Sequence, residues 1–460
     1  MVKSFRPAAV ALVAACGLTL GACATAGTQD KGNSSPDNAG TAGIAEACEQ
    51  YGDFTMTVGF SEASETIGAG FAALIEEFEA ANPNVTIELQ AKEWASSQQT
   101  IRLVMSGDDP PDVMQGNEGW SIDGALWQAG LIANLDPYAE LYGWFDEFPE
   151  SALTVNKFSA DGTVLGEGNL VAVPQAIQYV GVFYNKSVLA ELGVDDVSVL
   201  DDQAKFLEVL ETAKAAGKVP VVLGNSEKWP MLHNLSLFNG WYDEPDVIDA
   251  WVFNTPGATY DTPGRLQGST DLVDWTNKGY FNADAQALTL ADATARFAEG
   301  ESPFFITGTW SLGDVYGGLG DDAGFMLWPK NEAGLHRAVG GYSLPFTMST
   351  KTEYPDCAAN FIDFVTASES AIAAQIAAGR PSATKAGAQA TVDNPMLAEM
   401  IREYERLNAD DGLFTWEDWP TPTMGTLMMS EAQRMVGGEI TPQEYNTAIQ
   451  ENWDEYMATR

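Results

Sequence analysis

The stretch FTMTVGFSEASETIGAGFAALIEEFEAANPNVTIEL, residues 54–89, predicts a strand, a helix and a second strand in succession. Phe54–Phe60 is a run of β-forming residues. Four apolar residues then recur at the spacing of one helix face: Phe71, Leu74, Ile75 and Phe78. Asn82-Pro83-Asn84 ends this helix, and residues 85–89 alternate apolar with polar side chains as a half-buried strand does. Strands separated by helices imply parallel pairing in an α/β fold.

The same alternation continues beyond this stretch. Further short strands are predicted at 112–114, 219–223 and 303–306, whereas helical patterns dominate the last third of the chain. The final helix opens with the capping box TPQE at 441–444. The body contains no internal repeat and no sharp linker. For an α/β chain of 460 residues, we therefore expect lobes whose segments interleave in sequence.

The charge of the chain excludes several classes of partner. It has 65 Asp and Glu residues against 23 Lys and Arg, a formal net charge of −42. Such a surface repels phosphate backbones and anionic lipid, so we expect neither nucleic-acid binding nor binding to a membrane surface. Only two His and four Cys are present, and the common nucleotide, hydrolase and zinc motifs are missing. We expect no catalytic residue, no cofactor and no metal, with a calcium ion on an acidic doublet as the alternative.

The N-terminus predicts an export signal. Lys3 and Arg6 precede an apolar stretch at 8–20, too short to span a bilayer, and Leu20-Gly21-Ala22-Cys23 resembles a bacterial lipobox. We expect residues 1–22 to be a lipoprotein signal peptide and Cys23 to carry the lipid. Residues 23–47 contain few large apolar side chains, which indicates a flexible tether. An ordinary secretory signal that contains a Cys is the alternative.

Two cysteines remain in the body, Cys48 and Cys357. In a chain that folds outside the reducing cytoplasm they could form a disulfide. Two buried free thiols are the alternative, and the sequence leaves both open.

Tryptophan is the most informative residue type in the body. Thirteen Trp are present, and six lie in loop-like stretches beside Gly, Pro, Asn or acidic residues: Trp94, Trp120, Trp229, Trp310, Trp416 and Trp419. An indole offers a flat apolar face to a sugar ring, and nearby polar groups can bind its hydroxyls. We expect some of these residues in the core instead, as for Trp453 on a helical stripe.

Seven stretches in order resemble the bacterial extracellular solute-binding proteins of family 1, the sugar-binding group that includes maltose-binding protein. They are FAALIEEFEAANPNVTIEL (71–89), MSGDDPPDVMQGNEGW (105–120), GLIANLDPYAE (130–140), VAVPQAIQYVGVFYNKSVLAELGV (171–194), ESPFFITGTW (301–310), AVGGYSLPFTMSTKTEYPDCAANFIDFVTAS (338–368) and GRPSATKAG (379–387). Each stretch alone is weak evidence for the resemblance, whereas seven stretches in the right order behind a lipobox are specific to the family.

The resemblance implies two α/β lobes that close on a ligand around a hinge of about three crossings, a periplasmic-binding-protein-like fold. One lobe would contain 48–176 and 337–381, and the other 177–336 and 382–460. It also implies a monomeric lipoprotein on the outer face of the cell membrane, attached only through its lipid. Such a protein captures an oligosaccharide and delivers it to the permease subunits of an ABC importer, without catalysis.

The resemblance also implies a ligand site at the carboxyl ends of the strands. Trp310 matches the most recurrent stacking Trp of the family, and Arg380 could make paired hydrogen bonds to vicinal hydroxyls. The full set carried over is Ser61, Glu62, Asn117, Glu118, Trp120, Gln178, Tyr179, Asn225, Trp229, His233, Trp310, Gly341, Tyr342, Arg380, Trp416, Asp418 and Trp419. Most polar positions differ from maltose-binding protein, so maltose itself is not implied.

Two other functions use similar residues. A secreted carbohydrate-active enzyme also pairs Trp with carboxylates, and a polyamine receptor uses acidic and aromatic groups for a cation. The absence of a basic cluster among the expected site residues favours a neutral ligand over a phosphate or carboxylate.

Overall fold

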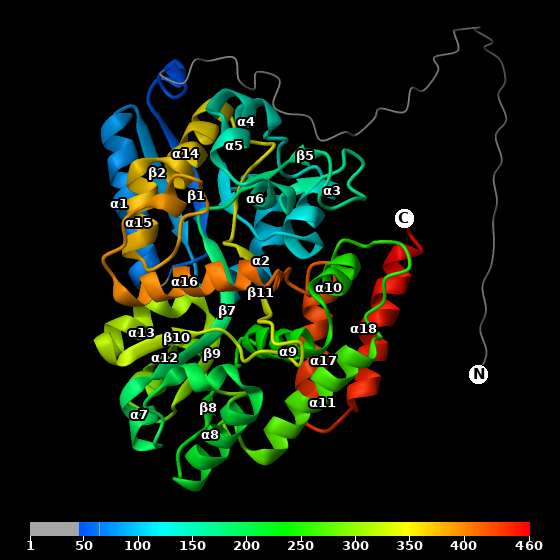
Figure 1. Ribbon diagram of the computed structural model, residues 1–460. Helices are drawn as coiled ribbons and strands as arrows, with labels where there is room; N and C mark the ends of the chain where they lie inside the picture. Colours follow the sequence, from blue (N-terminus) through cyan, green and yellow to red (C-terminus); the bar gives the residue numbers. More distant parts are fainter. Residues whose placement is uncertain (1–45, 64) are drawn as a thin grey trace, which may run out of the picture. The chain divides into compact units, whose positions relative to one another are not determined.

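The computed structural model describes residues 46–63 and 65–460 (Figure 1). The predicted signal peptide, Cys23 and the tether up to residue 45 lie outside the described residues. Within the described residues, no helix has both the length and the apolar character needed to cross a bilayer.

The predicted strand, helix and strand of residues 54–89 are present. They are β1 (Phe54–Phe60), α1 (Glu65–Ala81) and β2 (Val85–Ala91), and β1 pairs in parallel with β2. The four apolar residues of the helix face, Phe71, Leu74, Ile75 and Phe78, are buried. Phe71 stacks on Phe60, with 4.0 Å between ring centroids, so the predicted face packs onto the strand that precedes it.

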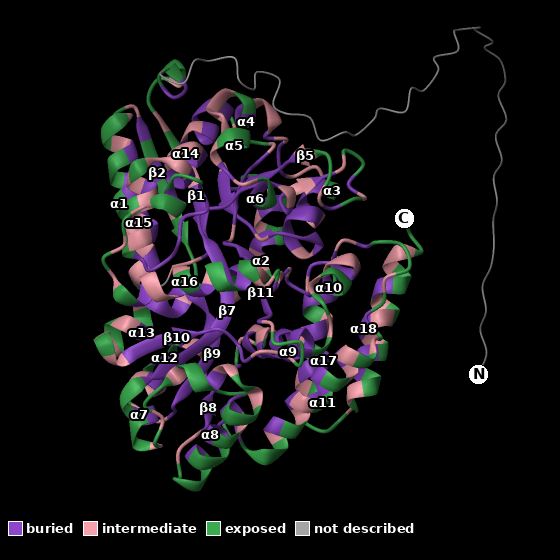
Figure 2. Cartoon of the chain, viewed as in Figure 1, coloured by how far each residue is buried: buried purple, intermediate pink, exposed green. Residues whose placement is uncertain are grey.

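Two larger sheets carry most of the strands. The first has the order β2-β1-β3-β12-β6, with β3 (Val113–Gln115), β12 (Phe346–Met348) and β6 (Ala172–Val173). The second has the order β13-β11-β7-β9-β8, with β13 (Leu413–Phe414), β11 (Ala338–Tyr342), β7 (Ile177–Asn185), β9 (Phe304–Gly308) and β8 (Val221–Val222). A further strand, β10 (Ala323–Met326), pairs with β7. Strands β7 and β9 are buried along their whole length (Figure 2).

Helices account for most of the remaining chain. The longer ones are α2 (Trp94–Ser106), α8 (Gln203–Ala215), α9 (Trp229–Tyr242), α10 (Pro245–Val252), α11 (Pro263–Lys278), α12 (Leu290–Ala298), α13 (Leu312–Leu319), α14 (Pro355–Ala367), α15 (Glu369–Ala377), α16 (Pro395–Ala409), α17 (Met424–Val436) and α18 (Pro442–Met457). The shorter elements are α3 (Ala125–Gln128), α4 (Asp136–Tyr142), α5 (Trp144–Glu147), α6 (Glu150–Thr154), α7 (Lys186–Glu191), β4 (Lys157–Phe158) and β5 (Asn169–Leu170). The predicted capping box of α18 is present, because Thr441 and Glu444 each accept the other's backbone N–H. Trp453 of α18 is buried, as the helical stripe predicts.

The chain passes between the two sheets more than once, which confirms the interleaved α/β fold. It leaves the first sheet after Val173, enters the second at Ile177, and returns between Tyr342 and Phe346. A third connection follows α15, where Ser382 forms a bridge with Ala176. The chain then enters α16, which packs against β10.

One segment lies in a different sheet from the one predicted. Our lobe boundary at 337 puts β11 in the first lobe, but Gly340, Gly341 and Tyr342 pair with β7, and the start of β11 pairs with β13. Its backbone hydrogen bonds are therefore satisfied within the second sheet. The return to the first sheet follows Tyr342 rather than Arg337.

The two body cysteines form a disulfide. Cys48 and Cys357 are bonded, with 4.6 Å between their Cα atoms, across 309 residues of sequence. Both are buried. Of the two alternatives left open by the sequence, the structure contains the disulfide, which ties the start of the described body to α14.

Candidate functional site

Four aromatic side chains from three separate segments meet in one cluster. Trp229 and His233 lie on the first turns of α9, Trp310 follows β9, and Trp416 follows β13. The ring of Trp310 lies 5.8 Å from Trp229, 5.4 Å from His233 and 6.0 Å from Trp416, centroid to centroid. His233 is also 4.8 Å from Trp416. We call these four residues the aromatic cluster. Its members were all expected from the sequence.

Local geometry explains why Trp310 lies in the cluster. Strand β9 ends at Gly308, and a Cβ atom there would overlap the indole of Trp310. Glycine therefore lets the ring fold back over the end of its own strand. Trp310 remains half-buried, whereas Phe304, Phe305 and Ile306 of β9 supply the core. Gly341 lies beside the cluster, since its Cβ would stand 3.6 Å from Nε1 of Trp416.

The cluster carries polar atoms that the fold does not use. We call a buried polar atom open when no residue in the described part of the chain offers it a hydrogen-bond partner. Nε1 of Trp229, Nε1 of Trp310 and Nδ1 of His233 are open. Burial lowers the pKa of His233 to about 3, so its ring is neutral at physiological pH. The cluster thus combines uncharged apolar faces with two N–H donors and one neutral imidazole.

A second group of residues surrounds the carboxylate of Glu62, in the loop after β1. Its Oε1 accepts hydrogen bonds from Nη1 of Arg380 at 2.7 Å and from Nε2 of Gln178 at 3.3 Å. Its Oε2 accepts from Nε2 of Gln115 at 2.7 Å. Gln115 ends β3 of the first sheet and Gln178 belongs to β7 of the second, so one carboxylate joins both sheets.

Arg380 contributes open donors to this group. Its side chain is 0% exposed, and both Nε and Nη2 are open. Because a buried guanidinium gains from every hydrogen bond it can make, these two nitrogens can donate to a ligand oxygen next to Glu62.

Three further carboxyls lie close together. Glu118 is 1% exposed and its Oε1 is open. Burial raises its pKa well above the usual value, and the charges of Asp123, Glu62 and Asp418 raise it further. Burial also raises the pKa of Asp123 well above normal and that of Asp418 to about 6. Burial therefore favours the protonated form of Glu118, which can donate as well as accept a hydrogen bond.

The segments that carry Glu118 and Asp418 are held against each other. The backbone N–H of Trp120 donates to the carbonyl oxygen of Trp419 at 2.9 Å. Gly119 has a φ of +77°, and a Cβ there would overlap the ring of Trp419. Trp419 itself is buried. The contact places the loop 416–419 of the second sheet against the loop after β3 of the first.

The raised pKa of Asp418 leads to a pH prediction. A carboxyl whose folded pKa exceeds its unfolded value destabilises the protein as the pH rises between those values, since the folded state binds the proton more tightly. The asparagine variant D418N removes this effect. Between pH 5 and pH 7, we expect the free energy of unfolding of D418N to rise by about 1 kcal/mol relative to wild type. Chemical unfolding at several pH values measures this difference, and a difference that does not change with pH would contradict the account.

Several predicted residues make structural contacts instead of presenting free groups. The Ser61 hydroxyl bonds to Ser97 Oγ at 2.6 Å and to the Gln115 carbonyl at 3.0 Å. Asn225 accepts from the Met231 N–H at 2.9 Å and donates to Gln286 at 2.8 Å, which holds the start of α9. These polar side chains are used within the fold.

Three predicted aromatic residues are also buried within the fold. Tyr179 donates from its hydroxyl to the Met400 carbonyl at 2.6 Å, on the opposite face of β7 from Gln178. Trp120 packs edge-to-face on Phe158 in the smaller core cluster. The hydroxyls of Tyr342 and Ser151 lie 2.7 Å apart. Asn117 is half-buried, and its backbone N–H donates to Asp123.

Gln115 and Asp123 are absent from the sequence prediction, although both lie in this region. Gln115 is the last residue of a short strand whose neighbour β1 runs parallel to it. Polar residues at the carboxyl ends of parallel strands gather at ligand sites. That rule points to Gln115, whereas Asp123 lies in a helical turn where we find no comparable signal.

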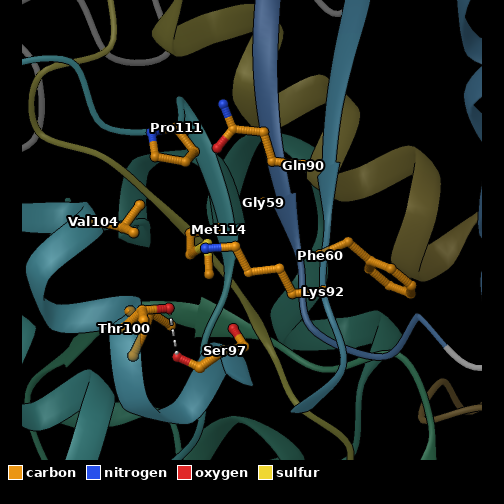
Figure 3. A pocket seen from close by; sticks show the side chains of 10 residues that line it. Gly59, Phe60, Gln90, Lys92, Ser97, Thr100, Val104, Pro111 and Met114 are labelled. Atoms are coloured by element: carbon orange, nitrogen blue, oxygen red, sulfur yellow. Dashed lines mark hydrogen bonds between the residues drawn. The ribbon is translucent and has the colours of Figure 1, made fainter. Parts of the chain in front are cut away.

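A separate small pocket lies in the first sheet region, between β1, β2 and α2 (Figure 3). Gly59, Lys92, Ser97 and Met114 are among the residues that line it. Once open solvent is left out, its volume is about that of a single water molecule, which is too small for a ligand. None of the residues expected at the ligand site lines it. Among the described side chains, no group of three or more His, Cys, Asp or Glu could hold a metal ion.

Comparison with known proteins decides the family. The model of the bacterial extracellular solute-binding proteins matches residues 62–372. The chain belongs to this family. The family and the relatives described next are binding proteins.

Relatives of this solute-binding protein cover most of its length. A multiple sugar-binding protein of Streptococcus mutans is 22% identical over 403 residues, 83% of this chain and 89% of the relative. An ABC transporter extracellular-binding protein of Pyrococcus horikoshii is 22% identical over 64% of each chain. A chitin oligosaccharide binding protein of known structure superposes with a TM-score of 0.77 at 19% identity, covering 88% of this chain and 99% of that one. This likeness confirms the two-lobed fold.

Proposed function

We propose that this solute-binding protein captures a neutral oligosaccharide and delivers it to an ABC importer without catalysis. The relatives named above are sugar-binding or ABC transporter proteins. The observation that carries the proposal is the aromatic cluster with open N–H groups on Trp229 and Trp310. Such a cluster offers what one face of a sugar ring needs, an apolar surface rimmed by hydrogen-bonding groups.

The open atoms include both donors and acceptors. Arg380 and the two indoles donate, whereas the open Oε1 of Glu118 accepts when ionised. A buried polar atom left without a partner costs about 1–3 kcal/mol, so a ligand that pairs with several of these atoms gains binding energy. A sugar hydroxyl can both donate and accept, which fits a mixed set better than a purely cationic or anionic group does.

The charges around this set favour a neutral sugar. The one basic residue we assign to the site, Arg380, is already paired with Glu62, so its charge is balanced before any ligand binds. Burial raises the pKa of Glu118, Asp123 and Asp418 and so favours their uncharged forms, which suits a neutral ligand. A polyamine is the second candidate, and it would pair with the carboxyls but leave the donors of Arg380 and the indoles open.

The proposed site comprises Glu62, Gln115, Gln178 and Arg380 together with Glu118, Asp418 and the aromatic cluster. We propose that the two lobes close around it. The lobes would follow the predicted boundaries, 48–176 and 337–381 against 177–336 and 382–460, with the second crossing moved to follow Tyr342. The remaining predicted residues, such as Tyr179 and Trp120, would support the site from the core.

A thermal-shift screen tests the proposal. The panel contains maltotriose, xylotriose, triacetylchitotriose and raffinose, with galacturonic acid trimer and spermidine as charged controls. A ligand present at one hundred times its Kd stabilises the protein by about 2.7 kcal/mol. We expect at least one neutral sugar to raise the melting temperature. Stabilisation by spermidine alone would favour the polyamine receptor, and stabilisation by the acidic trimer alone would contradict both.

We further propose that the protein is lipid-anchored through Cys23, which predicts the behaviour of C23A. Cys23 precedes the described residues, and the tether sequence around it has few large apolar side chains, so the variant should fold normally. In cells we expect it in the medium or the soluble extracytoplasmic fraction, whereas wild type sediments with membranes. Fractionation followed by immunoblotting measures this, with C16A in the signal region as the control. Equal membrane retention of C23A and wild type would contradict the anchor.

A further inference from the structure

An ion pair lies buried beneath the loop that carries Trp416, Asp418 and Trp419. Nε of Arg265, on the first turn of α11, donates to Oε1 of Glu417 at 2.9 Å. The side chains are 0% and 1% exposed. Glu417 stands between Trp416 and Asp418 in sequence, so the ion pair fixes the backbone of the two residues proposed to face the ligand.

Both partners make additional contacts. Oε2 of Glu417 accepts from Nδ2 of Asn239 on α9 at 3.0 Å. The guanidinium of Arg265 lies 4.6 Å from the ring centroid of Tyr260, and its Nη1 donates to the Thr259 carbonyl at 3.2 Å. Asp243 lies 3.6 Å from the same Nη1. Glu417 is thus attached to α9, which carries Trp229 and His233, as well as to α11.

The rest of the loop is held at both ends. At its start, the Thr415 N–H and hydroxyl donate to Asp249 of α10, at 2.8 Å and 2.6 Å. At its end, Asn254 donates to the Pro420 carbonyl at 3.1 Å. Glu417 lies midway between these ends. Its carboxylate adds an ion pair and a hydrogen bond to the four residues 416–419, whose other contacts include ring packing of Trp416 and the bond from the Trp120 N–H to the Trp419 carbonyl.

We propose that Arg265 is a positioning residue for the oligosaccharide site, and that it acts through Glu417 to hold Trp416 and Asp418 in place. This inference rests on the proposed function. A well-packed apolar pair can replace many buried ion pairs without loss of stability, so stability alone does not explain a charged pair here. Its position under the ligand loop does, because Arg265 and Asn239 each donate to a different oxygen of Glu417 and so fix the orientation of its carboxylate as well as its distance.

The experiment uses the full chain with the Glu417→Gln substitution and a matched control, Ser269→Ala. Gln keeps the shape of Glu417 and its acceptor oxygen but removes the charge. Ser269 lies one turn after Arg265 on the same helix, is equally buried, and donates to Asn446 at 3.0 Å without touching the loop. Hydrogen exchange of the peptide 413–422 in ligand-free protein should be faster by about tenfold in Glu417→Gln and unchanged in Ser269→Ala.

Binding is measured with the neutral trisaccharides of the screen. We expect Glu417→Gln to weaken binding about tenfold, and Ser269→Ala to leave it unchanged. In a Trp416→Ala background, Glu417→Gln should weaken binding less than twofold further, because the two changes act through the same contact. If Glu417→Gln instead caused a structural defect unrelated to the loop, its loss of binding would add in full to that of Trp416→Ala.

The outcomes separate the two proposals. Wild type that binds no sugar would overturn the proposed function, whereas the exchange rates still test whether the pair holds the loop. Wild type that binds, together with Glu417→Gln that exchanges and binds like wild type, would overturn the role of Arg265 alone. Where Glu417→Gln fails to fold, Arg265→Lys, which keeps the charge but loses the planar fork, provides the same comparison.

Discussion

Replacing Trp310 by alanine should weaken oligosaccharide binding by about thirtyfold or more. Trp310 touches the other three members of the aromatic cluster and is only half-buried, so it presents one face away from the core. An aromatic anchor in a binding site costs roughly 2 kcal/mol when truncated, and 1.4 kcal/mol corresponds to a factor of ten in affinity. Titration calorimetry with the most stabilising trisaccharide of the screen measures the loss.

The matched control is Trp453→Ala. Trp453 is buried on α18, and its indole N–H donates to the Trp251 carbonyl at 3.1 Å. Truncating a core Trp costs about 3–5 kcal/mol of stability, so this variant should melt far lower while its folded fraction binds normally. Trp310→Ala should show the reverse pattern, a large loss of affinity with a smaller loss of stability. If Trp310→Ala instead melted far lower while its folded fraction bound the sugar normally, Trp310 would be a core residue.

Removing the disulfide should lower the free energy of unfolding by about 2–4 kcal/mol, the second large effect. The bond closes a loop with a sequence separation of 309 residues, and cross-links over long loops restrict the unfolded chain most. The variant in which both Cys48 and Cys357 are alanine should unfold at lower urea concentration than wild type. Sugar binding should be retained, because the bond joins the start of the body to α14 rather than to any proposed site residue.

Reducing agent provides the control for this prediction. It should destabilise wild type by a similar amount and leave the double variant unchanged. Equal urea midpoints for wild type and the double variant would show that the cross-link does not contribute to stability.

The spacing of apolar residues, together with the residues that begin and end helices, predicted much of the fold. The β1, α1 and β2 segments, the capping box of α18 and the burial of Trp453 all follow from local patterns that tertiary contacts reinforce. The sheet to which β11 belongs could not be predicted from local patterns. Its register with β7 depends on pairing between residues about 160 positions apart, which no local pattern encodes.

The candidate site could be predicted only in part, for a similar reason. The structure brings together the residues of the aromatic cluster, and it pairs Glu62 with Arg380. Adjacent residues on a strand point to opposite faces, so Gln178 faces Glu62 while Tyr179 enters the core. A match to the family thus predicts that a residue lies near the site. Whether its side chain points toward the site or into the core depends on the strand face, which the structure shows. Gln115 could have been predicted from its place at the carboxyl end of a parallel strand, whereas no motif in the sequence links Arg265 to Glu417, 152 residues away.

The central claim is that the protein binds a neutral oligosaccharide and releases it unchanged. The most direct test titrates wild type and Trp310→Ala with the most stabilising trisaccharide, then recovers the sugar after long incubation and analyses it by chromatography. The account predicts one binding site per wild-type chain, binding weakened about thirtyfold in the variant, and intact trisaccharide at the end. Shortened sugar that appears in proportion to protein and time would contradict it and identify an enzyme.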